Sequence, residues 1–467
     1  MRSRAPAPYN ADFTLPTGQI FLERTRLLAP LIYRVTLVSP ARIRTAVYCA
    51  AAVLLIFEAF WSVRLARADY DAAQPDLAGL TRACQLAPQA ANYWLRFASI
   101  REVDQPADPA VDAAIGRSIA LNPRYTEAWI ARAFREETQG RIADAERDYL
   151  AAAKVDRMYK PAWALANFYV RQGRTDRFWF YARKCLEVVE PRRLEPASYD
   201  PAPVFDLAWR VTQDASEIRS KLIPRRHFIL VDYLDYLGAR NLTDAGADIA
   251  MDVAPYGDPA DNYFLLNFCE RLINLSNLQH PAGRRAMEIW NAMVARGTVR
   301  GELLDPARGQ SLTNGDLKRP FEHVSFDWQM PPAEGVLCNH FPDAGEVRFD
   351  FSGDQPEGVL VFYQSVPVVP GDGYRLLFQY RTENMDHADG MTWQVWDYAN
   401  QHVIPVTSRL IPHAEWTAGE AAFTIPRGVF IARLGLVCQR ASGTTRIRGT
   451  AAFRGFSLRL DKPRGAI

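Results

Sequence analysis

The segment from Thr45 to Val63 constrains the whole chain, because it is the one stretch long and apolar enough to cross a lipid bilayer. It reads TAVYCAAAVLLIFEAFWSV and carries a single charged side chain, Glu58. A helix over this segment would reach roughly 28 Å at about 1.5 Å per residue, close to the thickness of the hydrocarbon layer. The sequence therefore predicts a transmembrane anchor over 45–63.

Arginines are concentrated before the anchor. Residues 1–44 contain seven arginines and two acidic residues, whereas Asp69, Asp71 and Asp76 follow soon after the anchor. Basic residues favour the cytoplasmic side of a membrane. We therefore expect 1–44 to be a cytoplasmic basic tail and the bulk of the chain to lie on the opposite side.

Two other interpretations of the anchor segment stay open. The first is a cleaved signal peptide, because Ala66, Arg67 and Ala68 fit the small-residue pattern of a cleavage site, although the preceding tail is far longer than an ordinary n-region. The second is a buried core helix, because a carboxylate at the bilayer centre is costly. Glu58 is near the outer end of the segment, where it can reach the interface, or it marks a contact with a polar partner helix.

The charge balance and the scattered chemistry-bearing residues argue against several classes of function. The net charge is +2, and no basic run has interleaved aromatic residues, so a nucleic-acid partner is not expected. The seven histidines form no HExxH or HxH pair, and the sequence contains no GxSxG, Walker or GxGxxG motif. We therefore expect a non-enzymatic protein with no cofactor and no catalytic metal.

The six cysteines form no CxxC pair, so neither a zinc ribbon nor a dithiol redox motif is expected. Cys338 and Cys438 both fall in the C-terminal region of the chain. They can form a disulfide if that region lies in an oxidising compartment, or they can remain separate buried thiols. The sequence leaves both alternatives open.

Three tryptophans, Trp94, Trp129 and Trp163, recur at spacings of 35 and 34 residues. Helical patterning with a period near 34 is typical of tetratricopeptide repeats, and the region 70–190 resembles that family. Counting from Trp129, the middle unit has small, turn or aromatic residues where the family has them, at Ala133, Gly140, Ala145, Tyr149 and Ala152. Small residues let paired helices approach closely, and the aromatic ring fills the space between neighbouring units.

The resemblance implies a scaffold whose concave surface binds protein partners. The candidate docking residues are expected on the inner helices of the repeats, at Tyr93, Arg96, Arg132 and Arg135. Each of them can equally be solvated or contact a neighbouring repeat.

Prolines interrupt the helical pattern after the repeats. The segment PRRLEPASYDPAP at 191–203 holds four prolines, and apolar helical segments such as FILVDYLDYLGAR and DNYFLLNFCERLINL follow it. We expect 191–304 to form degenerate helical repeats that continue the solenoid.

From about residue 305 the apolar pattern changes to a period of two. In EVRFDFSG, Val347 and Phe349 alternate with Arg348 and Asp350, and several similar segments follow with Gly, Pro, Asp and Asn between them. Short alternating strands with such turns predict an antiparallel β-sandwich of the jelly-roll type over 305–467. The predicted fold is therefore multidomain α plus β: a transmembrane helix, an α-solenoid of tetratricopeptide-like helical hairpins and a C-terminal β-sandwich.

Strand alternation allows one assignment in which polar and aromatic side chains share a single outer face of the sandwich. Amides, a guanidinium group and an indole are what a glycan groove needs, so we expect ligand binding there. The residues of this predicted face are Gln364, Gln379, Arg381, Gln394 and Trp396. The alternative is a face that is solvated or covered by the repeats.

The loop RTENMDHADG places Glu383, Asp386 and Asp389 together. Their carboxylates can hold a structural Ca²⁺ or belong to an ordinary polar turn, and both interpretations remain open.

The segment LTNGDLKRPFEHVSFDW, with VPGDGYRLLFQYRTENM and GTAAFRGFSLRL, resembles the carbohydrate-binding-module-like jelly rolls of the galactose-binding-like superfamily over about 312–461. The order of anchor, repeats and jelly roll is similar to that of bacterial envelope proteins associated with surface polysaccharide assembly. This resemblance implies an inner-membrane scaffold, with its bulk in the periplasm, that acts in synthesis or export of a surface polysaccharide. Two alternatives remain. One is a glycan-processing enzyme acting through the C-terminal domain, and the other is a structural repeat protein capped by the sandwich.

Overall fold

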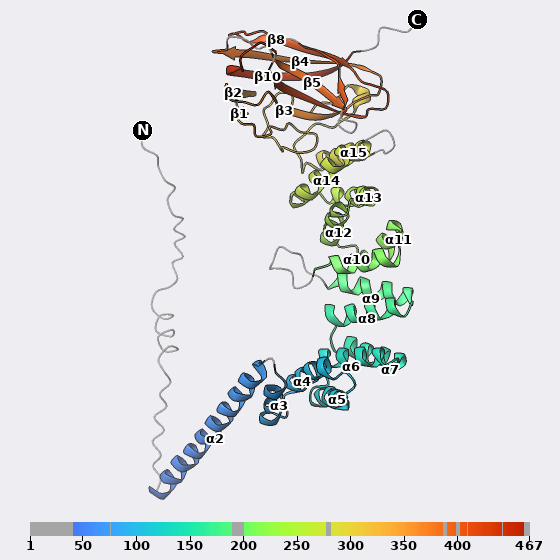
Figure 1. Cartoon of the computed structure of the whole chain (residues 1–467), viewed down its shortest axis with the longest axis vertical. Coiled ribbons are helices and arrows are strands. Elements are labelled where there is room, and N and C mark those ends of the chain that lie inside the picture. The colour runs from blue at the N-terminus through green and yellow to red at the C-terminus, as the bar shows by residue number, and fades with distance from the viewer. Residues whose placement is uncertain are drawn as a thin grey trace, which may run out of the picture. The chain divides into compact units, whose positions relative to one another are not determined.

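The computed structural model describes residues 41–461 except 75, 189–199, 277–281, 386–389, 398–401, 409 and 441, with side chains described from residue 45. Most of the predicted basic tail, the start of the proline-rich segment and two of the three acids in the candidate Ca²⁺ loop lie outside these residues. The chain divides into two compact units, one ending at Pro123 and the other beginning at Arg124 (Figure 1).

The first unit is helical. Its described elements are α2 (Ala41–Ala73), α3 (Leu77–Leu86), α4 (Ala91–Asp104) and α5 (Pro109–Leu121). The side chain of Asp76 accepts a hydrogen bond from the backbone N–H of Gly79 at the start of α3, and Asp108 accepts one from Ala110 at the start of α5. These are N-caps, which satisfy backbone donors that a helix start leaves unpaired.

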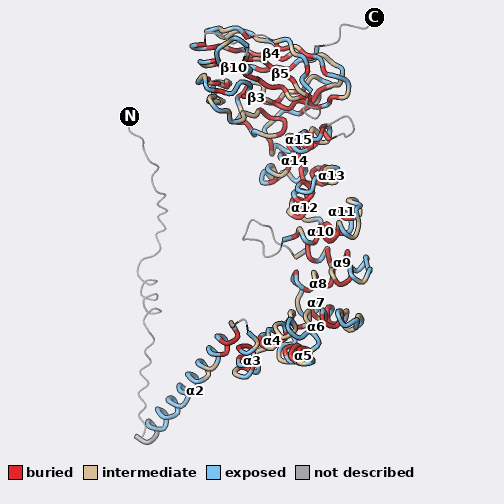
Figure 2. Tube along the Cα trace, viewed as in Figure 1, coloured by how far each residue is buried: buried red, intermediate tan, exposed pale blue. Residues whose placement is uncertain are grey.

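Helix α2 contains the predicted anchor but extends beyond it. Its stretch Thr45–Ala73 is long and apolar enough to cross a membrane, and none of its most apolar part is buried, which does not fit the core-helix interpretation. Figure 2 shows α2 as exposed over most of its length and buried only towards its C-terminal end. There Ala68 and Ala72 pack in one cluster with residues of α3, and Arg64 donates a hydrogen bond to the carbonyl of Leu86 at 2.7 Å. One unbroken helix is thus both the apolar segment and the first member of a helical hairpin.

The second unit begins with two helical hairpins. They are formed by α6 (Thr126–Thr138) with α7 (Ile142–Val155) and by α8 (Tyr159–Arg171) with α9 (Thr175–Glu187). Gly140 and Gly173 end the first helix of each hairpin with φ of 77° and 66°, a conformation that other residues rarely adopt. Tyr149 is buried, and its ring centroid lies 5.2 Å from that of Phe168 in the next hairpin. The predicted turn residue and the predicted inter-repeat aromatic residue are therefore confirmed.

Helices continue without the regular period. They are α10 (Ala202–Val211), α11 (Ala215–Lys221), α12 (His227–Ala239), α13 (Thr243–Val253), α14 (Asn262–Asn274) and α15 (Ala282–Arg296), with the 3₁₀ turns η1 (Ala254–Tyr256) and η2 (Pro259–Asp261). One hydrophobic core joins α10–α15 to α6–α9. A Cβ on Gly246 would come within 2.4 Å of the ring of Phe268, so glycine there lets α13 approach α14 closely. The predicted solenoid of helical pairs is confirmed.

The chain then forms ten strands among the described residues, after a short 3₁₀ turn η3 (Pro306–Arg308). A six-stranded antiparallel sheet has the order β1-β2-β10-β4-β8-β7, and a four-stranded one has the order β3-β9-β5-β6. The strands are β1 (Val336–Phe341), β2 (Glu346–Ser352), β3 (Gly358–Pro367), β4 (Gly373–Glu383), β5 (Met391–Asp397), β6 (His402–Ile404), β7 (Val406–Ser408), β8 (Thr417–Thr424), β9 (Ile431–Gln439) and β10 (Arg448–Asp461).

Aromatic side chains fill the space between the two sheets. Phe453 and Phe456 of β10 lie with ring centroids 6.2 and 5.5 Å from that of Trp393 on β5. On β2, Val347 and Phe349 are fully buried while Arg348 between them is half-buried. The predicted alternation and the predicted antiparallel sandwich are confirmed.

The sandwich packs directly on the last two helices. Phe326 and Ile431 belong to the same hydrophobic core as the helices, and the ring of Phe326 lies 5.9 Å from that of Trp290 on α15. A Cβ on Gly283 would come within 2.5 Å of Ile431, so α15 touches the sandwich closely. The sandwich has a hydrophobic core of its own, and Phe326 and Ile431 join it to the core of the helices.

Candidate functional site

The predicted glycan-binding face is not formed as one surface. Gln364 is fully buried on β3, and its Nε2 donates hydrogen bonds to the carbonyl and hydroxyl oxygens of Thr313, at 3.0 and 2.9 Å. A β-bulge between Leu360 and Phe362 shifts the alternation of this strand, which the sequence pattern did not reveal. Gln364 therefore ties the segment before the sandwich to the core, and its assignment to an outer face is wrong.

Gln394 and Trp396 lie on the outer face of the four-stranded sheet. Trp396 covers Gly435, where a Cβ would come within 2.9 Å of the indole, and it is the register partner of Arg433. The guanidinium group of Arg433 lies 3.6 Å from Glu270 of α14. Beside Trp396, this face is therefore in contact with the helices. This agrees with the alternative from the sequence in which the repeats cover the face.

Gln379 and Arg381 lie on the outer face of the other, six-stranded sheet. Arg381 meets the indole of Trp416, which lies just before β8. The guanidinium carbons of Arg381 and Arg454 lie 5.0 and 4.0 Å from the centroid of that ring. Gln379 accepts a hydrogen bond from Nε of Arg454 at 2.9 Å. We call these four residues, Gln379, Arg381, Trp416 and Arg454, the Trp416 face.

The Trp416 face offers both donors and acceptors. Arg381 lies 3.3 Å from Glu383 and 4.0 Å from Glu346, so its charge is largely balanced. Two guanidinium groups held against an indole keep an ordered arrangement through cation–π attraction.

Sequence reasoning missed Trp416 because strand pairing, not spacing along the chain, brings β4, β8 and β10 together.

The predicted docking residues on the repeats have different environments. Tyr93 is buried and donates a hydrogen bond to Asp69, and its burial together with this bond raises the pKa of Tyr93 to about 12. Arg135 is only 3 % exposed. Arg132 is half-buried, pairs with Asp148 of α7 and lies 4.6 Å above the ring of Trp129. Tyr93 and Arg135 are therefore structural residues that a partner cannot reach.

Arg96 is exposed on α4, so its side chain is the most accessible of the four predicted docking residues. A role in docking stays a prediction for Arg96.

An apolar groove lies between α7, α8 and α9, with a volume of about 530 Å³. Met158 and Phe180 line it and are 54 % and 52 % exposed, which is high for large apolar side chains. Lys154 and Arg157 line it as well and form no ion pair with any residue that the structure describes. We call this feature the α7–α9 groove.

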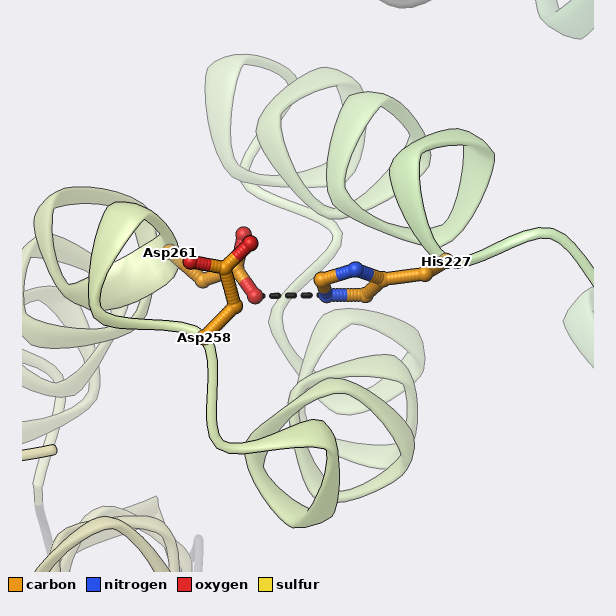
Figure 3. A group of neighbouring side chains, drawn as sticks. All are labelled: His227, Asp258 and Asp261. Carbon is orange, nitrogen blue, oxygen red and sulfur yellow. Dashed lines mark hydrogen bonds and ion pairs between the residues drawn. The ribbon is translucent and has the colours of Figure 1, made fainter. Parts of the chain in front are cut away.

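Another group of neighbouring side chains, drawn in Figure 3, consists of His227, Asp258 and Asp261. One donor atom from each lies within 4.8 Å of the others, and Nε2 of His227 lies 2.5 Å from a carboxylate oxygen of Asp261. An imidazole with two carboxylates is a donor set that suits a divalent transition metal. However, Asp258 accepts a hydrogen bond from the N–H of Ala260, and Asp261 holds His227. The contact between Asp261 and His227 joins η2 to the start of α12.

The two cysteines of the sandwich are free thiols in the structure. Burial raises the pKa of Cys338 to about 11 and that of Cys438 to about 12. Both thiols are therefore protonated and weakly reactive near neutral pH.

No protein family matches the sequence, and no curated protein matches it. Among solved structures, the crystal structure of MamA covers 29 % of this chain and 82 % of its own length at 20 % identity, with a TM-score of 0.24. PilF of Pseudomonas aeruginosa covers 42 % of this chain and 89 % of its own length at 12 % identity, with a TM-score of 0.27. The Cut9–Hcn1 hetero-tetramer of the APC/C covers 48 % of this chain and 37 % of its own at 11 % identity, with a TM-score of 0.24. At these TM-scores the fold rests on the helices and strands of this chain alone.

Proposed function

We propose that this chain is a non-enzymatic, single-pass membrane scaffold. Its helical repeats bind a protein partner, and its β-sandwich binds a glycan through the Trp416 face. We infer from the order of anchor, repeats and sandwich that the protein acts in synthesis or export of a surface polysaccharide at a bacterial inner membrane. The N-terminus is then cytoplasmic and the repeats and the sandwich are periplasmic.

The continuity of α2 carries this proposal. An apolar, exposed segment leads without a break into a helix that packs on α3 through Ala68, which is fully buried. Removal of the anchor by cleavage after Ala68 would take half of this hairpin away, which favours an uncleaved anchor. The helical repeats are thereby joined to the membrane through a folded hairpin.

The α7–α9 groove supports a protein partner that carries apolar and acidic side chains. We expect a photo-crosslinking amino acid at Phe180 to capture one partner protein in cells, because large exposed apolar side chains mark interaction surfaces. The same amino acid at Tyr263, which is 72 % exposed on α14, is the control. Changing Lys154 and Arg157 together to Glu should lower the yield at Phe180 about tenfold. Equal capture at both positions would contradict docking in the groove.

The Trp416 face supports the glycan-binding part of the proposal. We expect the detergent-solubilised full chain to bind one member of a panel of bacterial polysaccharides in a pull-down or titration. Trp416→Ala and Arg381→Ala should each weaken that binding about tenfold, since an indole and charged hydrogen-bond donors are the main contacts to a sugar. Trp396→Ala should leave it unchanged.

Loss of binding in Trp396→Ala alone would move the glycan site to the four-stranded sheet. Unchanged binding in all three variants, or no binding by the well-folded chain, would contradict a glycan site on either face.

The structural-cap alternative is favoured by one observation. Phe326 and Ile431 of the C-terminal region are part of the core of the helices, so the sandwich closes the end of the solenoid. A cap and a glycan-binding face are compatible, because the Trp416 face belongs to the six-stranded sheet and the closed end involves β3 and β9 of the other.

A further inference from the structure

A polar pocket of about 620 Å³ lies among α9, α11, α12 and α13 of the second unit. Its polar lining comes mainly from six side chains, namely Arg183, Ser216, Arg219, Ser220, Arg225 and Asp252. Its apolar floor includes Ile223 and Leu230, which are nearly buried. Pockets of this size hold small organic ligands.

The pocket has an excess of positive charge. Asp252 is the one acidic residue that lines it, and it pairs with Arg219. Arg183 pairs with Glu187 at 3.5 Å, at an exposed position where an ion pair contributes little. Arg225 is exposed and forms no ion pair with any residue that the structure describes. Asp252 and Glu187 therefore balance the charges of Arg219 and Arg183, and the charge of Arg225 is left for an anionic ligand to balance.

The hydroxyl of Ser216 adds a hydrogen-bond donor, whereas the hydroxyl of Ser220 already donates to the carbonyl of Glu217 at 3.0 Å. Ser216 and Ser220 are four residues apart on α11, so they lie on the same side of that helix and face the pocket with Arg219. Guanidinium groups match the oxygens of phosphate with paired hydrogen bonds, and a phosphate monoester carries close to two negative charges at neutral pH.

We propose that this pocket binds a phosphate monoester of a small organic group. The phosphate contacts Arg183, Arg219 and Arg225, and the organic group lies against Ile223, Leu230 and the exposed ring of Tyr256. A carboxylate offers fewer oxygens than a phosphate to the three guanidinium groups, and inorganic phosphate would leave the apolar floor uncovered.

The test is isothermal titration of the detergent-solubilised full chain with four probes: glucose 1-phosphate, inorganic phosphate, glucose and the short-chain lipid dihexanoyl phosphatidic acid. We expect saturable binding of at least one organic phosphate, about tenfold weaker binding of inorganic phosphate, and none of glucose. Tighter binding of glucose 1-phosphate points to a soluble sugar phosphate, and tighter binding of the lipid points to a headgroup. Binding should weaken as salt is raised.

Arg225→Gln and Arg219→Gln should each weaken the binding about tenfold, because each removes charged hydrogen bonds to the phosphate. Arg300→Gln is the matched control, since Arg300 is exposed outside the pocket and forms no ion pair with the described residues. Asp252→Asn should tighten binding several-fold, because it removes the competing charge. Thermal unfolding of each variant checks its fold.

No saturable binding of any phosphate probe by the folded chain would overturn the proposal. So would equal losses in Arg225→Gln and Arg300→Gln, because these would mean that binding is a general effect of surface charge. A well-folded Asp252→Asn chain that binds no better than the native chain would contradict the assigned charge balance.

Discussion

Two arginines in place of Leu54 and Leu55 should release the chain from membranes. Both side chains lie in the middle of the apolar part of α2 and are 64 % and 70 % exposed, so they face lipid if the helix spans a bilayer. An arginine at the centre of a membrane helix costs about 3 kcal/mol, and two cost about 6 kcal/mol. That free energy is enough to reverse the partition of a single anchor helix.

The measurement is alkaline extraction of membranes followed by detection of the chain in pellet and supernatant. We expect the native chain in the pellet and the Leu54→Arg, Leu55→Arg chain mostly in the supernatant. Val103→Arg is the control, because Val103 is 81 % exposed on α4 beyond the anchor, and this variant should stay in the pellet. A double variant that remains fully in the pellet would rule out anchoring by α2 alone.

Trp328→Ala should lower the free energy of unfolding by about 4 kcal/mol, the usual cost of truncating a buried tryptophan. Trp328 is fully buried, and its ring stacks on Phe362 with centroids 4.2 Å apart. Its indole N–H also donates to the carbonyl of Asn314 at 3.2 Å, so truncation leaves an unpaired buried acceptor as well as a cavity.

Denaturant unfolding of the full chain, followed by tryptophan fluorescence and circular dichroism, measures this loss. Trp396→Ala is the matched control, because it removes the same side chain from a half-buried position, and its loss should be less than half as large. Similar losses in both variants would mean that the stacked aromatic core contributes less than its burial implies. Because Phe326 and Ile431 pack into the core of the helices, we expect α14 and α15 to unfold in the same transition as the sandwich.

Local patterns determined the elements of this fold. The apolar run predicted the long first helix, and the spacing of Trp94, Trp129 and Trp163 predicted the helical hairpins in which these residues lie. The alternation in EVRFDFSG predicted a strand with one buried face. The apolar run and the alternation depend on side chains close together in the chain, where helix and strand geometry decides which residues share a face. The tryptophan spacing reports the same hairpin recurring in successive repeats.

Such patterns predicted the site residues less well than they predicted the helices and strands. Tyr93 and Arg135 look like candidates for a concave surface by position, yet both are buried by neighbours whose contacts no period reveals. Likewise, the donors of the polar pocket come from α9, α11 and the segment before α12, and Asp252 comes from α13, so no motif could join them.

The sequence by itself determined that the chain has an apolar helix, helical hairpins and a β-sandwich, because hydrophobic periodicity is a local property. Only the tertiary structure decided that Gln364 is internal, that Arg381 meets Trp416 rather than Trp396, and that α2 continues into the first hairpin. The physical reason is that a bulge reverses the faces of a strand and that sheet order depends on long-range pairing. Both follow from packing of the whole domain, which is not written in any one segment.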